Sequence, residues 1–308
     1  MTRTLDRRHF VKGMAGLGAG LAVGRVAAQN TATRPNILLI VAEDMGPTLS
    51  CYGDPQVRTP HLDRLAAQGV RFERAFVTQA SCSPSRSSIL TGLYPHQNGQ
   101  LGLSHYGFRM PDGLPNLPSE LKKADYRTGI VGKLHVNPAK DFPFDFKGVG
   151  HGKTRDVRAP AASFRQFLQD GGAKPFFFYL NFADAHTPFS AQVAGVPEHP
   201  TKPDDVKPWD FLGIDSPELR QRVAGYYNSV RRVDEGIGQL MKVLDNPGRA
   251  LQAHPQPARR QAQGALWRSG WMPRRQTVPN RCLQGFCCTA GIRHVSGMRP
   301  RRAVRPGT

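Results

Sequence analysis

The sequence predicts an α/β fold with a mostly parallel central sheet. Two unbroken apolar runs, at 36–42 and 175–182, have the length and composition of strands that are covered on both faces. A long amphipathic helix is expected after Ser216, because apolar residues then recur in alternating steps of four and three as far as Leu244. Open α/β sheets place their sites beyond the carboxyl ends of such strands.

Shorter elements are expected between these two runs. A helix over 59–69 has a threonine cap, a proline at its first position and a glycine at its end. Apolar residues at 70–77 then predict a strand. A second short helix is expected over 118–124, followed by a short strand that ends near Gly132.

The first thirty residues resemble a twin-arginine export signal. Arg7 and Arg8 precede an apolar Gly/Ala-rich stretch at 13–23, and small residues at 26–28 offer a cleavage site. The apolar stretch is shorter than the roughly 20 residues that a membrane span needs, so no stable membrane insertion is expected. Residues 1–28 therefore predict a periplasmic or secreted protein, the alternative being a basic disordered leader.

The net charge of +19 is concentrated near the C-terminus. Residues 246–308 contain twelve Arg and no Asp, Glu or Lys, so they supply +12 of it. Apolar periodicity also ends near Asn246. A basic interaction tail, a disordered linker and a shifted reading frame of GC-rich DNA are three interpretations, and the residue mix favours the third. This distribution argues against nucleic acid as a partner.

Five cysteines show no paired spacing, so neither a disulfide framework nor a zinc site is expected. Cys82 differs from the others in its neighbours. Ser83 is placed to cap a short helix, Pro84 suits its first position, and Gly92 suits its end. Cys82 would then lie at a helix N-terminus, which favours negative charge, and Arg86 one turn later could point to the same place.

Polar side chains also follow the predicted strands. Glu43 and Asp44 come directly after the first strand, Lys133 and His135 after the strand near Gly132, and Asp184 and His186 after the strand at 175–182. Each pair by itself would be read as a solvated turn. Because carboxyl ends of parallel strands meet at one edge, we expect a site there.

The run Cys-x-Pro-Ser-Arg at 82–86, followed by Leu-Thr-Gly at 90–92, resembles the signature of the type I sulfatases. The approach TPHLDRLAAQGVRFERAF at 59–76 and the Gly-Lys-x-His string at 132–135 are similar to the same family, as is Asp-x-His-x-Pro at 184–188. The resemblance covers roughly 34–245. It implies an alkaline-phosphatase-like three-layer sandwich, here incomplete at the C-terminus.

The resemblance also implies roles for these residues. A formylglycine-generating enzyme would oxidise Cys82 to formylglycine, whose hydrate attacks sulfur with one hydroxyl and expels sulfate with the help of the second. Lys133 would neutralise the sulfate oxygens, His135 would contact the formylglycine hydroxyl, and His186 would protonate the leaving group. Asp184 would orient the loop.

Glu43 and Asp44 are similar to the Asp-Asp pair that binds calcium in the family, with the side chain at Cys82 as a further ligand. Glu43 departs from that pattern by one methylene. The family also has a strand ending in Asp-Asn-Gly or Asp-His-Gly after the long helix, then a basic sulfate-binding residue, and this sequence has neither. Calcium takes six to eight oxygens, so we expect a partial site and a chain that is inactive or unstable as written.

Several strings are similar to the N-sulfoglucosamine sulfohydrolase branch, among them HQNGQLGL and RTGIVGKLHV. They imply an N-sulfate or O-sulfate on a glycan as the substrate. The same signature also serves phosphonate monoester hydrolases, and a truncated remnant or an exported basic binding protein is the non-enzymatic alternative. A shifted reading frame near codon 246 that restored the missing strand would argue against the last two.

Overall fold

The structure, a computed structural model, describes residues 34–172 and 174–245 together with the two-residue strand β6 (Ala265–Leu266). The export signal predicted for 1–28 lies outside the described residues, as does nearly all of the Arg-rich stretch 246–308.

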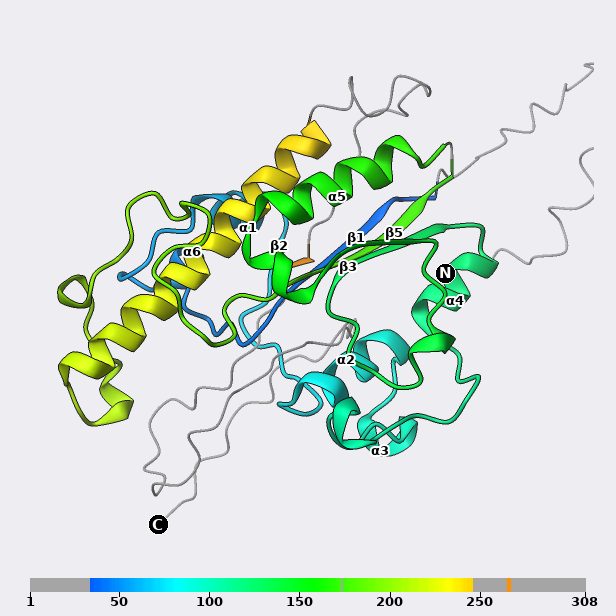
Figure 1. Cartoon of the computed structure of the whole chain (residues 1–308), viewed down its shortest axis with the longest axis horizontal. Coiled ribbons are helices and arrows are strands. Elements are labelled where there is room, and N and C mark those ends of the chain that lie inside the picture. Colours follow the sequence, from blue (N-terminus) through cyan, green and yellow to red (C-terminus); the bar gives the residue numbers. More distant parts are fainter. Residues whose placement is uncertain (1–33, 173, 246–264, 267–308) are drawn as a thin grey trace, which may run out of the picture. The chain divides into compact units, whose positions relative to one another are not determined.

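A parallel sheet forms the centre of the described chain, as predicted. Its four strands run in the order β1-β5-β3-β4, and every neighbouring pair is parallel (Figure 1). The strands are β1 (Ile37–Ala42), β3 (Arg127–Gly132), β4 (Phe146–Gly150) and β5 (Phe176–Phe182). All four therefore end at the same edge, where a site is expected.

Strand β5 shows how one apolar run serves two cores. All seven of its residues are buried. Phe178 and Leu180 belong to the core on one face of the sheet, whereas Phe177 and Tyr179 belong to the core on the other. Successive side chains of a strand point to opposite faces, so a strand between two helical layers must be apolar throughout.

Helices cover both faces of the sheet, which gives the predicted three layers (Figure 1). One layer contains α1 (Pro60–Gln68), α5 (Arg158–Gln169) and α6 (Pro217–Asp245). The other contains α2 (Cys82–Thr91), α3 (Pro95–Asn98) and α4 (Leu117–Lys123). The apolar stripe of α6 packs on the sheet, because Val230 and Ile237 share a core with Phe178.

Short 3₁₀ helices lie in the connections, and two of them border the site described below. They are η2 (Ser50–Tyr52), η3 (Ser104–Tyr106), η4 (Ala139–Asp141), η5 (His151–Arg155), η6 (Pro203–Asp205) and η7 (Asp210–Leu212).

The strand predicted over 70–77 is wrong for most of its length. Only Val70–Arg71 form a strand, β2, which pairs with β6 outside the central sheet. Val70 and Phe76 keep 66% and 62% of their surface exposed. A strand requires a hydrogen-bonded neighbour along its length, and apolar residues alone do not supply one.

Two elements that the sequence analysis did not anticipate, β4 and α5, complete the fold. Strand β4 contains two glycines, which weaken the strand pattern. Helix α5 contains Pro160, but this proline lies in the first turn, where the backbone N–H groups need no helical partner. The turn between them, η5, contributes two residues to the site.

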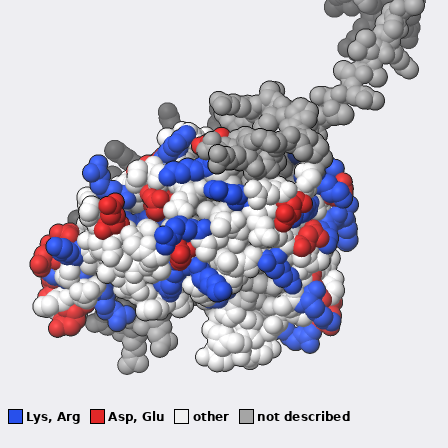
Figure 2. All heavy atoms as spheres, turned by 45° about the horizontal axis from the view of Figure 1, so that its top comes forward, with Lys and Arg blue, Asp and Glu red and all other residues white. Residues whose placement is uncertain are grey.

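The face of the described residues that Figure 2 shows is mixed in charge. On the face shown in Figure 2, Lys and Arg side chains are interspersed with Asp and Glu and form no single basic stripe. Within 34–172 and 174–245, no helix combines the length and the apolar character that crossing a membrane would require.

Candidate active site

Three strands deliver the predicted residues to one edge of the sheet. Glu43 follows β1, Lys133 follows β3 and Asp184 follows β5. The backbone joins two of these ends, because the Glu43 N–H donates to the Asp184 carbonyl at 3.1 Å and the Ala185 N–H donates to the Glu43 carbonyl at 2.6 Å. Parallel topology thus brings together residues that lie some 140 positions apart in the chain.

Cys82 is the first residue of α2, which corrects the expected start of this helix. The cap is Ser81, not Ser83, since the Ser81 carbonyl accepts the Ser85 N–H at 3.0 Å. The Ser83 hydroxyl instead accepts the backbone N–H of Ser104 at 2.9 Å. Gly92 ends the helix in the left-handed conformation, as predicted. The cysteine therefore lies in the first turn, where backbone N–H groups favour an anion.

Lys133 links the cysteine to the carboxylate behind it. Its Nζ lies 3.6 Å from Sγ of Cys82 and 2.8 Å from Oε1 of Glu43. Only 14% of the Lys133 side chain is exposed, and none of the Glu43 side chain is. The ammonium group is thus held beside the sulfur by a buried countercharge.

Arg86 lies fully inside the same cluster. Its Nη2 donates to Oε1 of Glu43 at 3.0 Å, while Nη1 donates to the Lys133 carbonyl at 2.8 Å and to the Tyr179 hydroxyl at 2.9 Å. It also donates to the side-chain carbonyl of Asn181. A buried guanidinium with this many acceptors joins α2 to the ends of three strands, which fixes the orientation of the helix.

The charges in this cluster shift one another's ionisation. Burial would raise the pKa of the Glu43 carboxyl, but Arg86 and Lys133 outweigh it and hold that pKa below its ordinary value. Burial would lower the pKa of Lys133, yet the Glu43 carboxylate keeps it above the ordinary lysine value. Both groups are therefore charged at neutral pH.

His151, in η5, is a site residue that the sequence analysis missed. Its Nε2 lies 3.3 Å from Oε2 of Glu43. Burial lowers the pKa of this imidazole, and the Glu43 carboxylate offsets only part of that effect. Lys133, Arg86 and His151 thus surround one carboxylate. The sequence pattern did not indicate His151, because the two glycines of β4 weaken the strand pattern directly before it.

Two further predicted site residues, His186 and Asp44, form a looser pair. Nε2 of His186 lies 3.8 Å from Oδ2 of Asp44, and the two side chains are 37% and 16% exposed. The other ring nitrogen of His186 lies 2.8 Å from the Thr187 carbonyl. Asp44 itself has a positive φ of 51°, a conformation uncommon outside glycine.

Asp184 anchors the loop that carries His186. Its buried carboxylate accepts Arg232 Nε at 2.7 Å and Arg155 Nη1 at 2.5 Å. Arg155 also donates to three backbone carbonyls of the loop, those of His186 at 2.8 Å, Thr187 at 2.9 Å and Pro188 at 3.2 Å. Arg155 and Arg232 were not anticipated, because nothing in their local sequence distinguishes them from surface arginines.

His135 has a histidine as its neighbour. Nε2 of His135 lies 3.0 Å from Nδ1 of His105, in η3. His105 is exposed and was not among the predicted residues. Two further basic residues near the family motifs, His96 and Lys174, do not belong to the site. His96 is exposed and stacks on Tyr94, and Lys174 pairs with Asp125 at 2.7 Å.

The described residues do not form a calcium site. Among them, no group of three or more His, Cys, Asp or Glu side chains could hold a metal ion, so the predicted set of Glu43, Asp44 and Cys82 is not assembled as one. The physical reason is visible at Glu43, whose carboxylate faces Lys133, Arg86 and His151. The two cations at this carboxylate, Lys133 and Arg86, disfavour a further cation, and two carboxylates supply only part of a calcium shell.

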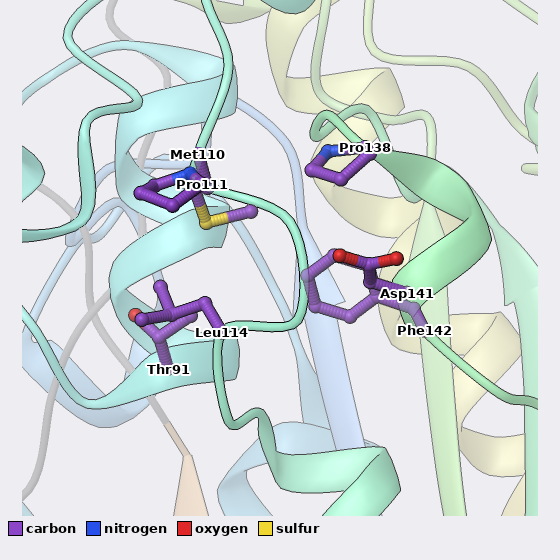
Figure 3. A pocket seen from close by; sticks show the side chains of 7 residues that line it. All are labelled: Thr91, Met110, Pro111, Leu114, Pro138, Asp141 and Phe142. Carbon is purple, nitrogen blue, oxygen red and sulfur yellow. The ribbon is translucent and has the colours of Figure 1, made fainter.

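A small pocket lies away from this cluster. Its lining comes from the C-terminal end of α2 and from the neighbouring loops (Figure 3). The lining residues are Thr91, Met110, Pro111, Leu114, Pro138, Asp141 and Phe142. Cys82 lies at the opposite end of α2, and the lining of the pocket is mostly apolar. The candidate site around Cys82 is therefore separate from this pocket.

Comparison with known proteins agrees with this geometry. The Sulfatase family model matches residues 35–251. Human N-sulphoglucosamine sulphohydrolase is 35% identical over 238 residues, which cover 69% of this chain and 47% of that protein. An ulvan-active sulfatase from Formosa agariphila is 31% identical over 219 residues, covering 69% and 42%. The chain thus spans less than half the length of these two relatives.

Solved structures share the fold at lower identity. The phosphonate monoester hydrolase of Agrobacterium radiobacter superposes with a TM-score of 0.55 at 20% identity, covering 70% of this chain and 60% of that one. Ps i-CgsB superposes with a TM-score of 0.53 at 24% identity, covering 70% and 55%. The sandwich is therefore that of the alkaline-phosphatase-like fold. With the family model matched over most of its length, the chain belongs to the sulfatase family.

Proposed function

We propose that the protein is a hydrolase of sulfuric esters or N-sulfates on glycans, with Cys82 converted to formylglycine. One observation carries the proposal: the Lys133 ammonium lies 3.6 Å from the Cys82 sulfur, at the N-terminus of α2. A nucleophile position, a fixed cation and backbone donors meet where a tetrahedral anion could bind. The human relative named for N-sulphoglucosamine supports a sulfated amino sugar as the substrate class.

Each side chain then has a definite task. Lys133 would neutralise charge on the sulfate oxygens, and the buried Glu43 holds its ammonium group in place. His135 would contact the hydroxyl at position 82. His186, held by Asp44 and the clamped loop, would donate a proton to the leaving oxygen or nitrogen. Formylglycine, once formed by a formylglycine-generating enzyme, would supply the hydrated aldehyde that attacks sulfur and later releases sulfate.

We further propose that the chain as written is impaired. Calcium, which the family resemblance implies, would need oxygen ligands beyond the described residues, because the Glu43 carboxylate is already paired with Lys133 and Arg86. From the Arg7-Arg8 signal we propose export to the periplasm or beyond.

Co-expression with a formylglycine-generating enzyme tests the chemistry. Mass spectrometry of the peptide that contains Cys82 should show an aldehyde in place of the thiol, and a Cys82→Ala variant is the matched control. An aryl sulfate, N-sulfated glucosamine and a phosphonate monoester should then be assayed side by side. Slow hydrolysis of sulfates alone supports the proposal, whereas preference for the phosphonate or an unmodified thiol contradicts it.

Calcium titration tests the impairment separately. Calcium should leave the thermal unfolding temperature of the purified chain unchanged, since a ligand that binds only the folded state would raise it. A clear calcium-dependent rise, together with turnover at the rate of intact sulfatases, would contradict the proposed impairment.

A further inference from the structure

The segment before the Gly-Lys-x-His string contributes a residue that the family signatures do not include. The 3₁₀ turn η3 (Ser104–Tyr106) brings His105 beside the ring of His135. The two imidazole planes are inclined by only 4° and the ring centroids lie 5.2 Å apart, so the rings are parallel and meet edge to edge. Their nearest nitrogens, Nδ1 of His105 and Nε2 of His135, are 3.0 Å apart, which is a hydrogen-bond distance.

The turn is attached to both signature segments. The Ser104 N–H donates to the hydroxyl of Ser83, next to Cys82, at 2.9 Å. The Ser104 carbonyl accepts the side-chain amide of Asn137, two residues after His135, at 2.8 Å. The location of His105 is therefore set by the nucleophile helix on one side and by the His135 loop on the other.

A buried glutamine supports the same loop. Gln100 has no exposed surface, and its amide donates to the carbonyls of Gly102 and Phe108, each at 2.8 Å. Its side-chain oxygen accepts the Asn137 N–H at 3.0 Å. Tyr106 covers the His105 ring at a centroid distance of 4.3 Å. These contacts fix the position of the turn, so the exposed His105 is held beside His135.

We propose that His105 is a positioning residue that fixes the tautomer and the orientation of His135. The inference rests on the proposed function for the role of His135, but the pairing itself does not. Nδ1 of His135 is buried and has no hydrogen-bond partner among the described residues. With Nε2–H of His135 donating to Nδ1 of His105, Nδ1 of His135 keeps its lone pair and can accept a proton from a hydroxyl. His105 is an exposed residue, so solvent is available to its other ring nitrogen, Nε2.

Imidazole NMR on the full chain tests the pairing without any need for turnover. The protein has ten histidines, so selective ¹⁵N labelling and the His135→Ala variant assign the ring of interest. We expect His135 to be protonated at Nε2 in the wild type and to lose this single tautomer in His105→Ala. His105→Asn should restore it, because the Asn side-chain oxygen occupies nearly the position of Nδ1.

The matched control is His96→Ala. His96 is an exposed histidine of α3 that stacks only on Tyr94 among the described rings. Its removal should leave the His135 signals unchanged. A thermal melt of each variant establishes that the fold is retained, which is expected because His105 is exposed.

Kinetics supply the second readout. On a sulfate substrate with the matured chain, His105→Ala should lower kcat on the order of 10-fold to 100-fold with little change in KM, and His105→Asn should recover most of it. His135 signals that stay the same in His105→Ala, or a wild-type ring protonated at Nδ1, would overturn the inference. Paired signals in a chain that hydrolyses no sulfate would contradict the proposed function and leave the pairing supported.

Discussion

The ammonium group of Lys133 lies 3.6 Å from the sulfur of Cys82, although 51 residues separate them. Lys133 follows β3 and Cys82 begins α2, so their contact depends on how α2 packs on the sheet. The buried Arg86 fixes that packing by joining α2 to Glu43 and to the Lys133 carbonyl. The cation and the nucleophile position are therefore set by a single charge cluster.

The first prediction concerns the thiol before maturation. Lys133→Met should slow alkylation of Cys82 by iodoacetamide about tenfold at pH 7.5, because a nearby ammonium favours the reactive thiolate by a few kcal/mol at most. Mass spectrometry of the modified peptides measures the rate, with Cys51 as an internal reference. Lys140→Met is the control, since Lys140 is 69% exposed and pairs with Asp112. Equal rates in all three proteins would contradict the coupling.

The second prediction concerns the loop of His186. Arg155→Met removes the donor to three loop carbonyls and to Asp184, so amides in 185–190 should exchange hydrogen at least tenfold faster, by an order-of-magnitude expectation for local opening. Hydrogen-exchange mass spectrometry measures this, and peptides from β5 should not change. Arg158→Met is the matched control, because Arg158 is 58% exposed. Equal hydrogen-exchange rates for 185–190 in the two variants would show that the Arg155 hydrogen bonds do not hold this loop in place.

The third prediction concerns Gly132, the last residue of β3. It has a φ of +83°, and an added Cβ would lie 2.2 Å from the Asn181 carbonyl oxygen. Gly132→Ala should therefore lower the free energy of unfolding by more than about 2 kcal/mol, measured by urea denaturation. Gly150→Ala is the control, since nothing lies within 4 Å of its added Cβ. A loss at Gly150 as large as that at Gly132 would show that the close approach is not the cause.

The fourth prediction concerns pH. Asp234 of α6 accepts the Leu62 N–H at 2.8 Å, and burial raises its pKa from 3.8 to about 6. A carboxyl with a raised pKa stabilises the fold below its unfolded pKa, and this contribution is lost as pH rises through about 6. The variant Asp234→Asn is neutral at every pH and does not lose this contribution. The difference between its free energy of unfolding and that of the wild type should therefore rise in favour of the variant from pH 4 to pH 7.5, by on the order of 3 kcal/mol.

Urea unfolding at the two pH values measures this change. Asp210→Asn is the control, because this side chain is 89% exposed. Its free energy of unfolding relative to the wild type should change little between the two pH values. The prediction fails if the stability difference between Asp234→Asn and the wild type is the same at both pH values.

Local sequence was sufficient for the elements that depend on one run of residues. The apolar run at 175–182 gave β5, and the cap, proline and stripe after Ser216 gave α6. The Cys-x-Pro-Ser-Arg run placed Cys82 at a helix N-terminus, although the helix begins two residues earlier than the capping pattern suggested. Prediction from local sequence failed at 70–77 and at β4, because a strand forms only beside a hydrogen-bonded neighbour, and the local pattern does not specify that neighbour.

The residues of the candidate site also fall into those that the sequence predicted and those that it did not. Resemblance to family motifs predicted Cys82, Arg86, Lys133, His135 and His186 as site residues, and the parallel order of β1, β5 and β3 brings the loops that follow these strands to one edge. His151, Arg155 and His105 could not be found in this way. Their roles arise from contacts with Glu43, Asp184 and His135, which lie 29 to 108 residues away in the chain.

The sequence alone determined which residue types are available and that parallel strands would present them at one edge, since periodicity and capping are local properties. Tertiary structure decided how their charges are matched. Glu43, predicted as a metal ligand, is paired with the cations Lys133 and Arg86 and lies beside His151, because the folded chain brings these side chains to one buried carboxylate. A buried charge requires neighbours of opposite sign, and only the folded chain specifies which ones they are.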